Sequence, residues 1–163
     1  EAAGDAVVIA CNAVSHLSAG IFEVYRTGDD TSGRLWSRTR AYGVNTLAFR
    51  LCQNNAFYKI DADCVGIIPG KIDWSLNRQW LRLLSVSGSP LFISVNPDDI
   101  TDGMKEDIKK AFFRNSGQKD KAEPLDWLYN NQPQCWLING EKREYDFVEN
   151  SYPELLSGST QSY

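Results

Sequence analysis

Four short apolar runs alternate with longer segments that carry apolar side chains at helical spacing. The runs are AVVIAC (6–11), GIFEVYR (20–26), AFYKIDAD (56–63) and PLFISVN (90–96). Their β-branched and aromatic content is typical of strands that are buried on both faces of a sheet. Strand and helix are therefore predicted to alternate four times, which is typical of a parallel sheet with helical crossovers. The sequence thus predicts an α/β fold.

The segments between and after these runs are predicted to be helical. The predicted helix over 73–88 has Asp73 as its N-cap and Gly88 as its stop signal, and the predicted helix over 32–53 is expected to loosen near Gly43. The apolar face of the helix over 73–88 consists of Leu76, Trp80, Leu83 and Leu84. The three predicted helices span 32–53, 73–88 and 102–115.

The character of the chain changes after residue 115. The polar segment NSGQKDKAEP (115–124) is expected to form a linker, whereas two strand-like runs flank Asn139-Gly140, a dipeptide typical of a tight hairpin turn. We therefore expect one domain over 1–115 and, over 116–163, a linker followed by a β-hairpin or the start of an antiparallel β domain. The last residues, SGSTQSY, are expected to be frayed.

Composition excludes several classes of function. The net charge of −4 argues against a nucleic-acid partner, which would require a basic surface. No apolar run approaches the roughly 20 residues needed to span a membrane. The chain has one His, and its four Cys show no metal-ligand spacing, so we expect no metal site, no cofactor, and cysteines that act mainly as small buried hydrophobic residues.

The chain enters its first predicted strand almost at once, with no initiator Met and no signal peptide (EAAGDAVVIACN). This start leads us to expect a fragment of a larger protein. Four β/α units would leave an unpaired sheet edge on each side. We therefore expect the chain to self-associate or to pair with a missing N-terminal half.

Polar and ionisable residues follow three of the predicted strands. They are Asn12 after the first strand, Arg26 with Asp29 and Asp30 after the second, and Asp61 with Asp63 after the third. In parallel α/β folds the carboxyl ends of the strands are where sites form. The alternative is that these strands simply lead into polar loops.

The segment RTGDD (26–30) combines an arginine with two carboxyl groups. Hydrolysis of a glycosidic bond requires two carboxyl groups, one to protonate the leaving oxygen and one to attack or to activate water. An arginine can position sugar hydroxyls beside them. Because Asp pairs after strands are also common as caps and ion-pair partners, the residues alone leave both interpretations open.

The order of the motifs resembles the second half of the catalytic barrel of the α-galactosidase (melibiase-like) families. The motifs are CN (11–12), RTGDDT (26–31), DADCVG (61–66) and SPLFISVNPDDIT (89–101). The resemblance covers about residues 6–115 and implies a partial (β/α)8 TIM barrel that contains about the last four β/α units. The hairpin that follows fits the β-sandwich that trails the barrel in these enzymes.

The resemblance also implies roles for individual residues. Asp30, four residues after Arg26, would be the general acid/base, and Asp29 is the alternative. Arg26 and Asn12 would contact the region of the sugar's 2-hydroxyl. Cys11 would line the pocket wall.

Asp61 and Asp63 would orient Arg26 and close the pocket floor, or alternatively only anchor their loop. The family's nucleophilic aspartate follows an earlier strand in a Lys-x-Asp motif. KID (59–61) imitates that motif but lies after the acid/base in the chain, so we do not assign Asp61 as the nucleophile. Asn12 and His16 depart from the family pattern, and His16 is expected to be a loop or packing residue.

The resemblance therefore predicts a retaining glycoside hydrolase that acts on α-galactoside-like sugars, with this chain inactive alone because the nucleophile lies upstream. Such enzymes usually act outside the cytoplasm. The alternative function is a non-catalytic carbohydrate-binding or scaffold domain. A nucleotide-binding α/β domain is disfavoured, because no strand is followed by G-x-G-x-x-G or G-x-x-x-x-G-K-[ST].

Overall fold

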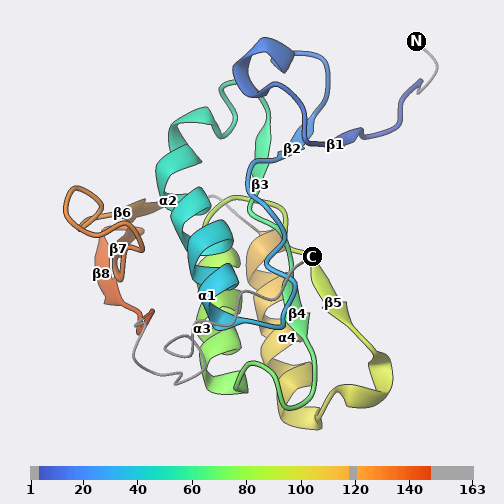
Figure 1. The fold of residues 1–163 in the computed structure, drawn as a ribbon, viewed down its shortest axis with the longest axis vertical. Coiled ribbons are helices and arrows are strands. Elements are labelled where there is room, and N and C mark those ends of the chain that lie inside the picture. The colour runs from blue at the N-terminus through green and yellow to red at the C-terminus, as the bar shows by residue number, and fades with distance from the viewer. Residues whose placement is uncertain (1–3, 118–120, 148–163) are drawn as a thin grey trace, which may run out of the picture.

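The computed structural model describes residues 4–117 and 121–147 (Figure 1). Its first sheet is parallel and has the order β1-β2-β3, with β1 at Ile9–Cys11, β2 at Val24–Arg26 and β3 at Lys59–Asp61. The register pairs Cys11 with Arg26 and Arg26 with Asp61. The last residues of the three strands therefore lie level at one end of the sheet.

A second parallel pair joins β4 (Val65–Ile67) to β5 (Ile93–Val95). Only three residues separate β3 from β4, and one of them, Asp63, has a left-handed backbone with φ of 71°. The chain bends there and continues into a different sheet. The described residues thus form a mixed α/β structure with small sheets and no closed barrel.

A helical stretch runs through most of the predicted segment 32–53. It consists of α1 (Trp36–Arg38), a π-helical stretch (Thr39–Val44), α2 (Asn45–Arg50) and a short 3₁₀ turn (Leu51–Gln53). The wide π turn contains Gly43, where the expected loosening is confirmed. A Cβ at Gly43 would lie 2.8 Å from Cζ2 of Trp80, so glycine allows this helix to approach the indole closely.

The helix α3 (Trp74–Leu84) forms within the predicted segment 73–88, but it ends at Leu84 with Ser85 as its C-cap, so the prediction of Gly88 as its stop signal is wrong. The carboxylate of Asp73 accepts a hydrogen bond from the Ser75 amide at 2.7 Å, which caps the first turn. The predicted apolar face is buried in the core: Leu76, Trp80, Leu83 and Leu84. The helix α4 (Asp102–Ser116) packs beside α3 and begins at Thr101, whose hydroxyl accepts from the Met104 amide at 3.3 Å.

The N-terminal part differs from the prediction. Between β1 and β2 lies only a 3₁₀ helix (Ser15–Ser18), so the alternation of strand and helix is wrong at this step. The predicted burial is also wrong here: Val7 is 68% exposed and Ile9 51%. The run forms an edge strand, and within the described residues no further layer covers it (Figure 1).

The C-terminal sheet is antiparallel with the order β6-β7-β8, at Ala122–Pro124, Cys135–Ile138 and Glu141–Glu144. The turn between the last two strands has positive φ at both Asn139 and Gly140, so the predicted hairpin is confirmed. β6 lies where only a linker was expected. Trp136 and Ile138 belong to the same apolar core cluster as the buried face of α3. The predicted frayed tail lies outside the described residues.

Candidate functional site

Five side chains meet at the carboxyl ends of β1, β2 and β3: Cys11, Arg26, Asp30, Asp61 and Asp63. We refer to them as the strand-end cluster. At its centre, Nη1 of Arg26 lies 2.8 Å from Oδ1 of Asp30 and 3.7 Å from Oδ1 of Asp63. Nη2 of Arg26 donates to the Cys11 sulfur at 2.8 Å. One guanidinium therefore joins residues from three strand exits.

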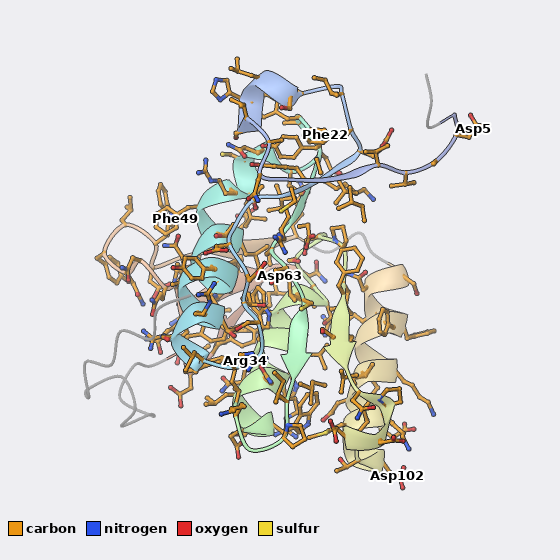
Figure 2. The ribbon with its side chains drawn as sticks, turned by 45° about the vertical axis from the view of Figure 1, so that its right-hand side comes forward. Asp5, Phe22, Arg34, Phe49, Asp63 and Asp102 are labelled. Carbon is orange, nitrogen blue, oxygen red and sulfur yellow. The ribbon has the colours of Figure 1, made fainter. Side chains whose placement is uncertain are left out.

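Asp63 both contacts Arg26 and anchors a loop. Its Oδ2 accepts hydrogen bonds from the amide and the hydroxyl of Thr31, at 2.7 and 2.9 Å. Its own amide donates to Oδ1 of Asp61 at 2.8 Å. In Figure 2, Asp63 lies between Phe22 and Arg34 along the long axis of the molecule. Asp63 therefore contacts Arg26 and also anchors its loop to Thr31, while its role in closing a pocket floor stays a prediction.

The loop after β2 crosses β4 at two glycines. A Cβ on Gly33 would lie 2.6 Å from backbone atoms of Gly66, and a Cβ on Gly66 would lie 2.7 Å from those of Gly33. Any larger residue at either position would push the two backbones apart. The loop therefore lies close against β4 at this point, and Thr31 is held beside it by hydrogen bonds to Asp63 and to the Cys64 carbonyl.

Asp29 and Asp30 face different arginines. Oδ2 of Asp29 lies 3.4 Å from Nη2 of Arg38 on α1, whereas Asp30 pairs with Arg26. Arg38 also donates through Nε to the Asp30 carbonyl at 2.9 Å. The two aspartate side chains are 54% and 57% exposed, so exposure does not distinguish them. Their positions distinguish them, because Asp30 contacts Arg26 in the strand-end cluster and Asp29 contacts Arg38 outside it.

Burial and neighbouring charges shift the pKa of several groups in and beside the cluster. Burial raises the pKa of Asp61, which is 5% exposed; the hydrogen bond from the Asp63 amide and the charge of Arg26 act in the opposite direction. Burial lowers the pKa of Arg26, but the contacts with Cys11, Asp30 and Asp63 outweigh it and the pKa is raised. Burial also raises the pKa of Cys64 to about 11, which keeps this thiol protonated.

The other predicted residues lie at the margin of the cluster. Asn12 is exposed, with a left-handed backbone at φ of 55°, and follows Cys11 directly. His16 is exposed in the 3₁₀ helix. Cys11 and Cys52 are exposed free thiols, so the expectation of buried cysteines is wrong for these two.

Within residues 4–117 and 121–147, no group of three His, Cys, Asp or Glu side chains could hold a metal ion. No helix in that part of the chain is long and apolar enough to cross a membrane.

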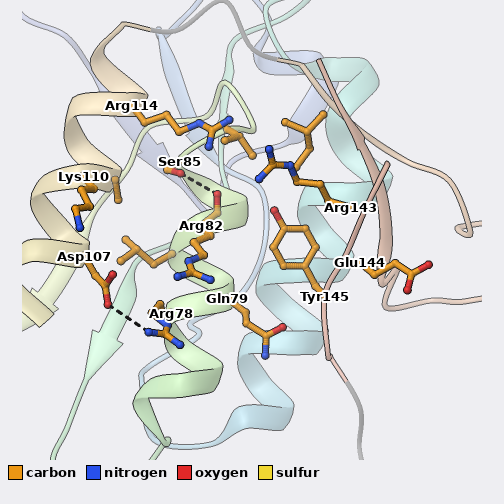
Figure 3. Close-up of a pocket in the computed structure, with 14 residues that line it drawn as sticks. Arg78, Gln79, Arg82, Ser85, Asp107, Lys110, Arg114, Arg143, Glu144 and Tyr145 are labelled. Atoms are coloured by element: carbon orange, nitrogen blue, oxygen red, sulfur yellow. Dashed lines mark hydrogen bonds and ion pairs between the residues drawn. The ribbon is translucent and has the colours of Figure 1, made fainter. Parts of the chain in front are cut away.

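Three cavities of the described structure lie away from the strand-end cluster. One of about 700 Å³ lies at the opposite end of the first sheet, and one of about 560 Å³ lies beside the loop from β4 to α3. A third, of about 410 Å³, lies between α3, α4 and β8 (Figure 3). The sequence analysis did not identify the cationic side chains that line this third cavity. A signal was present, because two of them lie four residues apart on α3 and two lie four residues apart on α4.

Comparison with protein-family models and with curated proteins found no match to this chain.

Proposed function

We propose that the chain is part of a retaining glycoside hydrolase that acts on α-galactoside-like sugars, with residues 1–115 forming the second half of its (β/α)8 barrel. The observation that supports this most is the pairing of Arg26 with Asp30 at 2.8 Å, at the carboxyl end of a parallel strand. A guanidinium beside an exposed carboxyl group, fixed from behind by Asp63, is an arrangement that can bind sugar hydroxyls and exchange a proton.

In this proposal Asp30 protonates the leaving oxygen and Arg26 holds sugar hydroxyls. Because the two side chains are paired in the structure, a hydroxyl that binds Arg26 has to compete with Asp30 for the guanidinium. Its binding would release the Asp30 carboxyl group toward the glycosidic oxygen. Cys11 and Asn12 would border the sugar on the side of β1.

The second carboxylate of a retaining mechanism, about 5–5.5 Å from the first, attacks the anomeric carbon. Asp61 is buried, and Asp63 is held by Thr31 and Arg26, so neither is free to attack. We therefore propose that the nucleophile lies outside this chain and that the 163-residue chain alone is inactive.

The test is hydrolysis of a chromogenic α-galactoside by the full-length gene product, by its Asp30→Asn variant and by this chain alone. Loss of a general acid should lower the turnover of the full-length protein by roughly 10²–10⁴-fold. Asp29→Asn is the matched control, since Asp29 is adjacent and equally exposed but pairs with Arg38, and it should retain most of the activity. Turnover by the short chain, or equal losses in the two variants, would contradict the assignment.

A non-catalytic carbohydrate-binding module is the second candidate. This function is favoured by the pairing of Asp30 and Asp63 with Arg26, and by the position of the cavities described above, which lie away from the cluster. In that case the full-length protein would bind sugars with equal affinity with Asp or Asn at position 30, and neither form would hydrolyse them.

We also propose that the exposed β1 edge pairs with a second copy or with further barrel strands. Ile9 in β1, Val7 shortly before it and Ile21 shortly before β2 present apolar side chains to solvent. Unpaired strand edges of this kind favour association. Light scattering at tens of micromolar should show a species larger than a monomer, and a monomer throughout that range would contradict this proposal.

A further inference from the structure

The cavity between α3, α4 and β8 is strongly cationic. It has a volume of about 410 Å³, within the range of small-molecule sites. Two carboxylates, those of Asp107 and Glu144, also line it. The cationic residues of its lining are Arg78, Arg82, Lys110, Arg114 and Arg143 (Figure 3). Such a concentration of positive charge is unexpected in a chain with a net charge of −4.

Helical periodicity creates this concentration. Arg78 and Arg82 are four residues apart on α3, and Lys110 and Arg114 are four apart on α4, so each helix presents a pair of cations on one face. Like charges at this spacing destabilise a helix slightly. α3 packs beside α4, and both pairs line the same cavity. The repulsion within each pair therefore adds to the repulsion between the helices.

The protein neutralises these charges only in part. Nη2 of Arg143 pairs with Oε2 of Glu141 on the same strand at 3.2 Å. Within the described ranges, the side chains of Arg82 and Lys110 make no ion pair, and Nη1 of Arg78 has one long contact, 3.9 Å from Oδ2 of Asp107. That oxygen also accepts a hydrogen bond from the Trp74 indole at 3.1 Å. Glu144 is paired with Lys142 at 2.8 Å. The acidic side chains of the lining are thus partly engaged elsewhere.

Tyr145 lines the same cavity as the cationic side chains. Burial raises the pKa of its phenol, while the charges of Arg143, Arg114 and Arg82 act in the opposite direction. The ring stacks on Phe147 with the centroids 5.3 Å apart, which fixes the phenol in place. The apolar part of the lining is Leu81, Val86, Ala111 and Ile138.

We propose that this cavity binds a small multivalent oxyanion, a phosphoryl or sulfuryl group, between the cations of α3, α4 and β8. Guanidinium groups form paired, charge-assisted hydrogen bonds with such oxygens, and an ammonium group adds a point charge. The bound anion would replace the repulsion among the cations with attraction. The Tyr145 hydroxyl would donate a further hydrogen bond. This inference is independent of the proposed hydrolase activity.

The test is calorimetric titration of the chain with inorganic phosphate, sulfate and pyrophosphate, with sodium chloride keeping the ionic strength constant. Arg82→Gln should weaken binding by about tenfold or more, because it removes a charge-assisted hydrogen bond. Lys110→Gln should weaken it less. Lys109→Gln is the matched control on the same helix, since Lys109 pairs with Glu106 outside the cavity and should leave the affinity unchanged.

The outcomes separate clearly. Binding of phosphate and pyrophosphate without sulfate, or of sulfate alone, would support the site and identify its group. Lys110 is exposed, so its variant should fold even if Arg82→Gln does not. The absence of binding beyond that of chloride would overturn the proposal. Equal losses from Lys109→Gln and Lys110→Gln would overturn it too, because the effect would then be one of net charge.

Discussion

The strand-end cluster and the cationic cavity differ in how their charges are balanced. In the cluster, Arg26 lies between Asp30 and Asp63, and the neighbouring Asp29 pairs with Arg38. In the cavity, cations outnumber carboxylates, and the Arg82 side chain makes no ion pair within the part of the chain that the structure describes. Strand ends and the loops that follow them build the first region, whereas two helices and β8 hold the like charges of the second together.

This difference implies opposite responses to mutation. Removal of one partner from a balanced cluster leaves a partly buried charge or hydrogen-bond donor unpaired, which is destabilising. Removal of one cation from an unbalanced set relieves repulsion. The signs of the stability changes should therefore separate a region that maintains the fold from one arranged for a ligand. The changes below test that comparison, from the largest expected effect to the smallest.

The largest effect is expected from Gly66→Ala. The new methyl group would lie 2.7 Å from backbone atoms of Gly33, so the loop that carries Asp30 has to move. We expect the free energy of unfolding to fall by about 3 kcal/mol, measured by urea denaturation. Gly103→Ala on α4 is the control, because the nearest atom to its Cβ is 4.0 Å away. A loss from Gly66→Ala no greater than that from the control would show that the contact does not hold the loop.

Asp63→Ala should have the next largest effect. It removes the acceptor of two hydrogen bonds from Thr31 and leaves alanine in a left-handed backbone conformation. We expect a loss of about 2–3 kcal/mol in the same measurement. Asp63→Asn keeps an acceptor and tolerates the backbone, so its loss should be about 1 kcal/mol. Equal losses in the two variants would assign the effect to the contact with Arg26 alone.

Asp61→Asn should change how stability depends on pH. Because burial raises the pKa of Asp61 above its ordinary value of 3.8, the folded state holds this proton more tightly than the unfolded chain does. The free energy of unfolding therefore falls as pH rises from the ordinary value through the raised one. Asp61→Asn should lack this part of the decrease in the free energy of unfolding, whereas Asp5→Asn, a change at an exposed position, should retain it. Parallel curves for Asp61→Asn and the unmodified chain would contradict the expectation.

The smallest effect is expected in the cavity without a ligand. Arg82→Gln and Lys110→Gln should each raise the free energy of unfolding by about 0.2–0.5 kcal/mol at low salt, because they relieve repulsion between cations four residues apart. The gain should shrink at high salt, where charges are screened. A destabilisation in both variants, measured by urea denaturation at two salt concentrations, would place the cavity in the same class as the strand-end cluster.

The sequence by itself determined the elements whose signals are local. The apolar spacing and the Asp73 cap specified α3, and Asn139-Gly140 specified the hairpin, because a few neighbouring residues decide caps, turns and helical faces. The sequence alone also indicated the polar residues at the ends of the first three predicted strands. Parallel pairing in register was enough to bring Cys11, Arg26 and Asp61 to one level. The residues of the candidate site could therefore be named before their contacts were known.

Only the tertiary structure decided which apolar strands are buried and which charges meet. The run at 6–11 looks like a core strand, yet it is exposed because burial depends on what packs against a strand and not on its own side chains. Asp29 and Asp30 are adjacent in the chain, yet they pair with different arginines, Arg38 and Arg26, and only the folded structure shows which pairs with which. The cationic cavity exists because α3 lies against α4. Taken separately, each helix shows only a charged face of the kind that solvent usually covers.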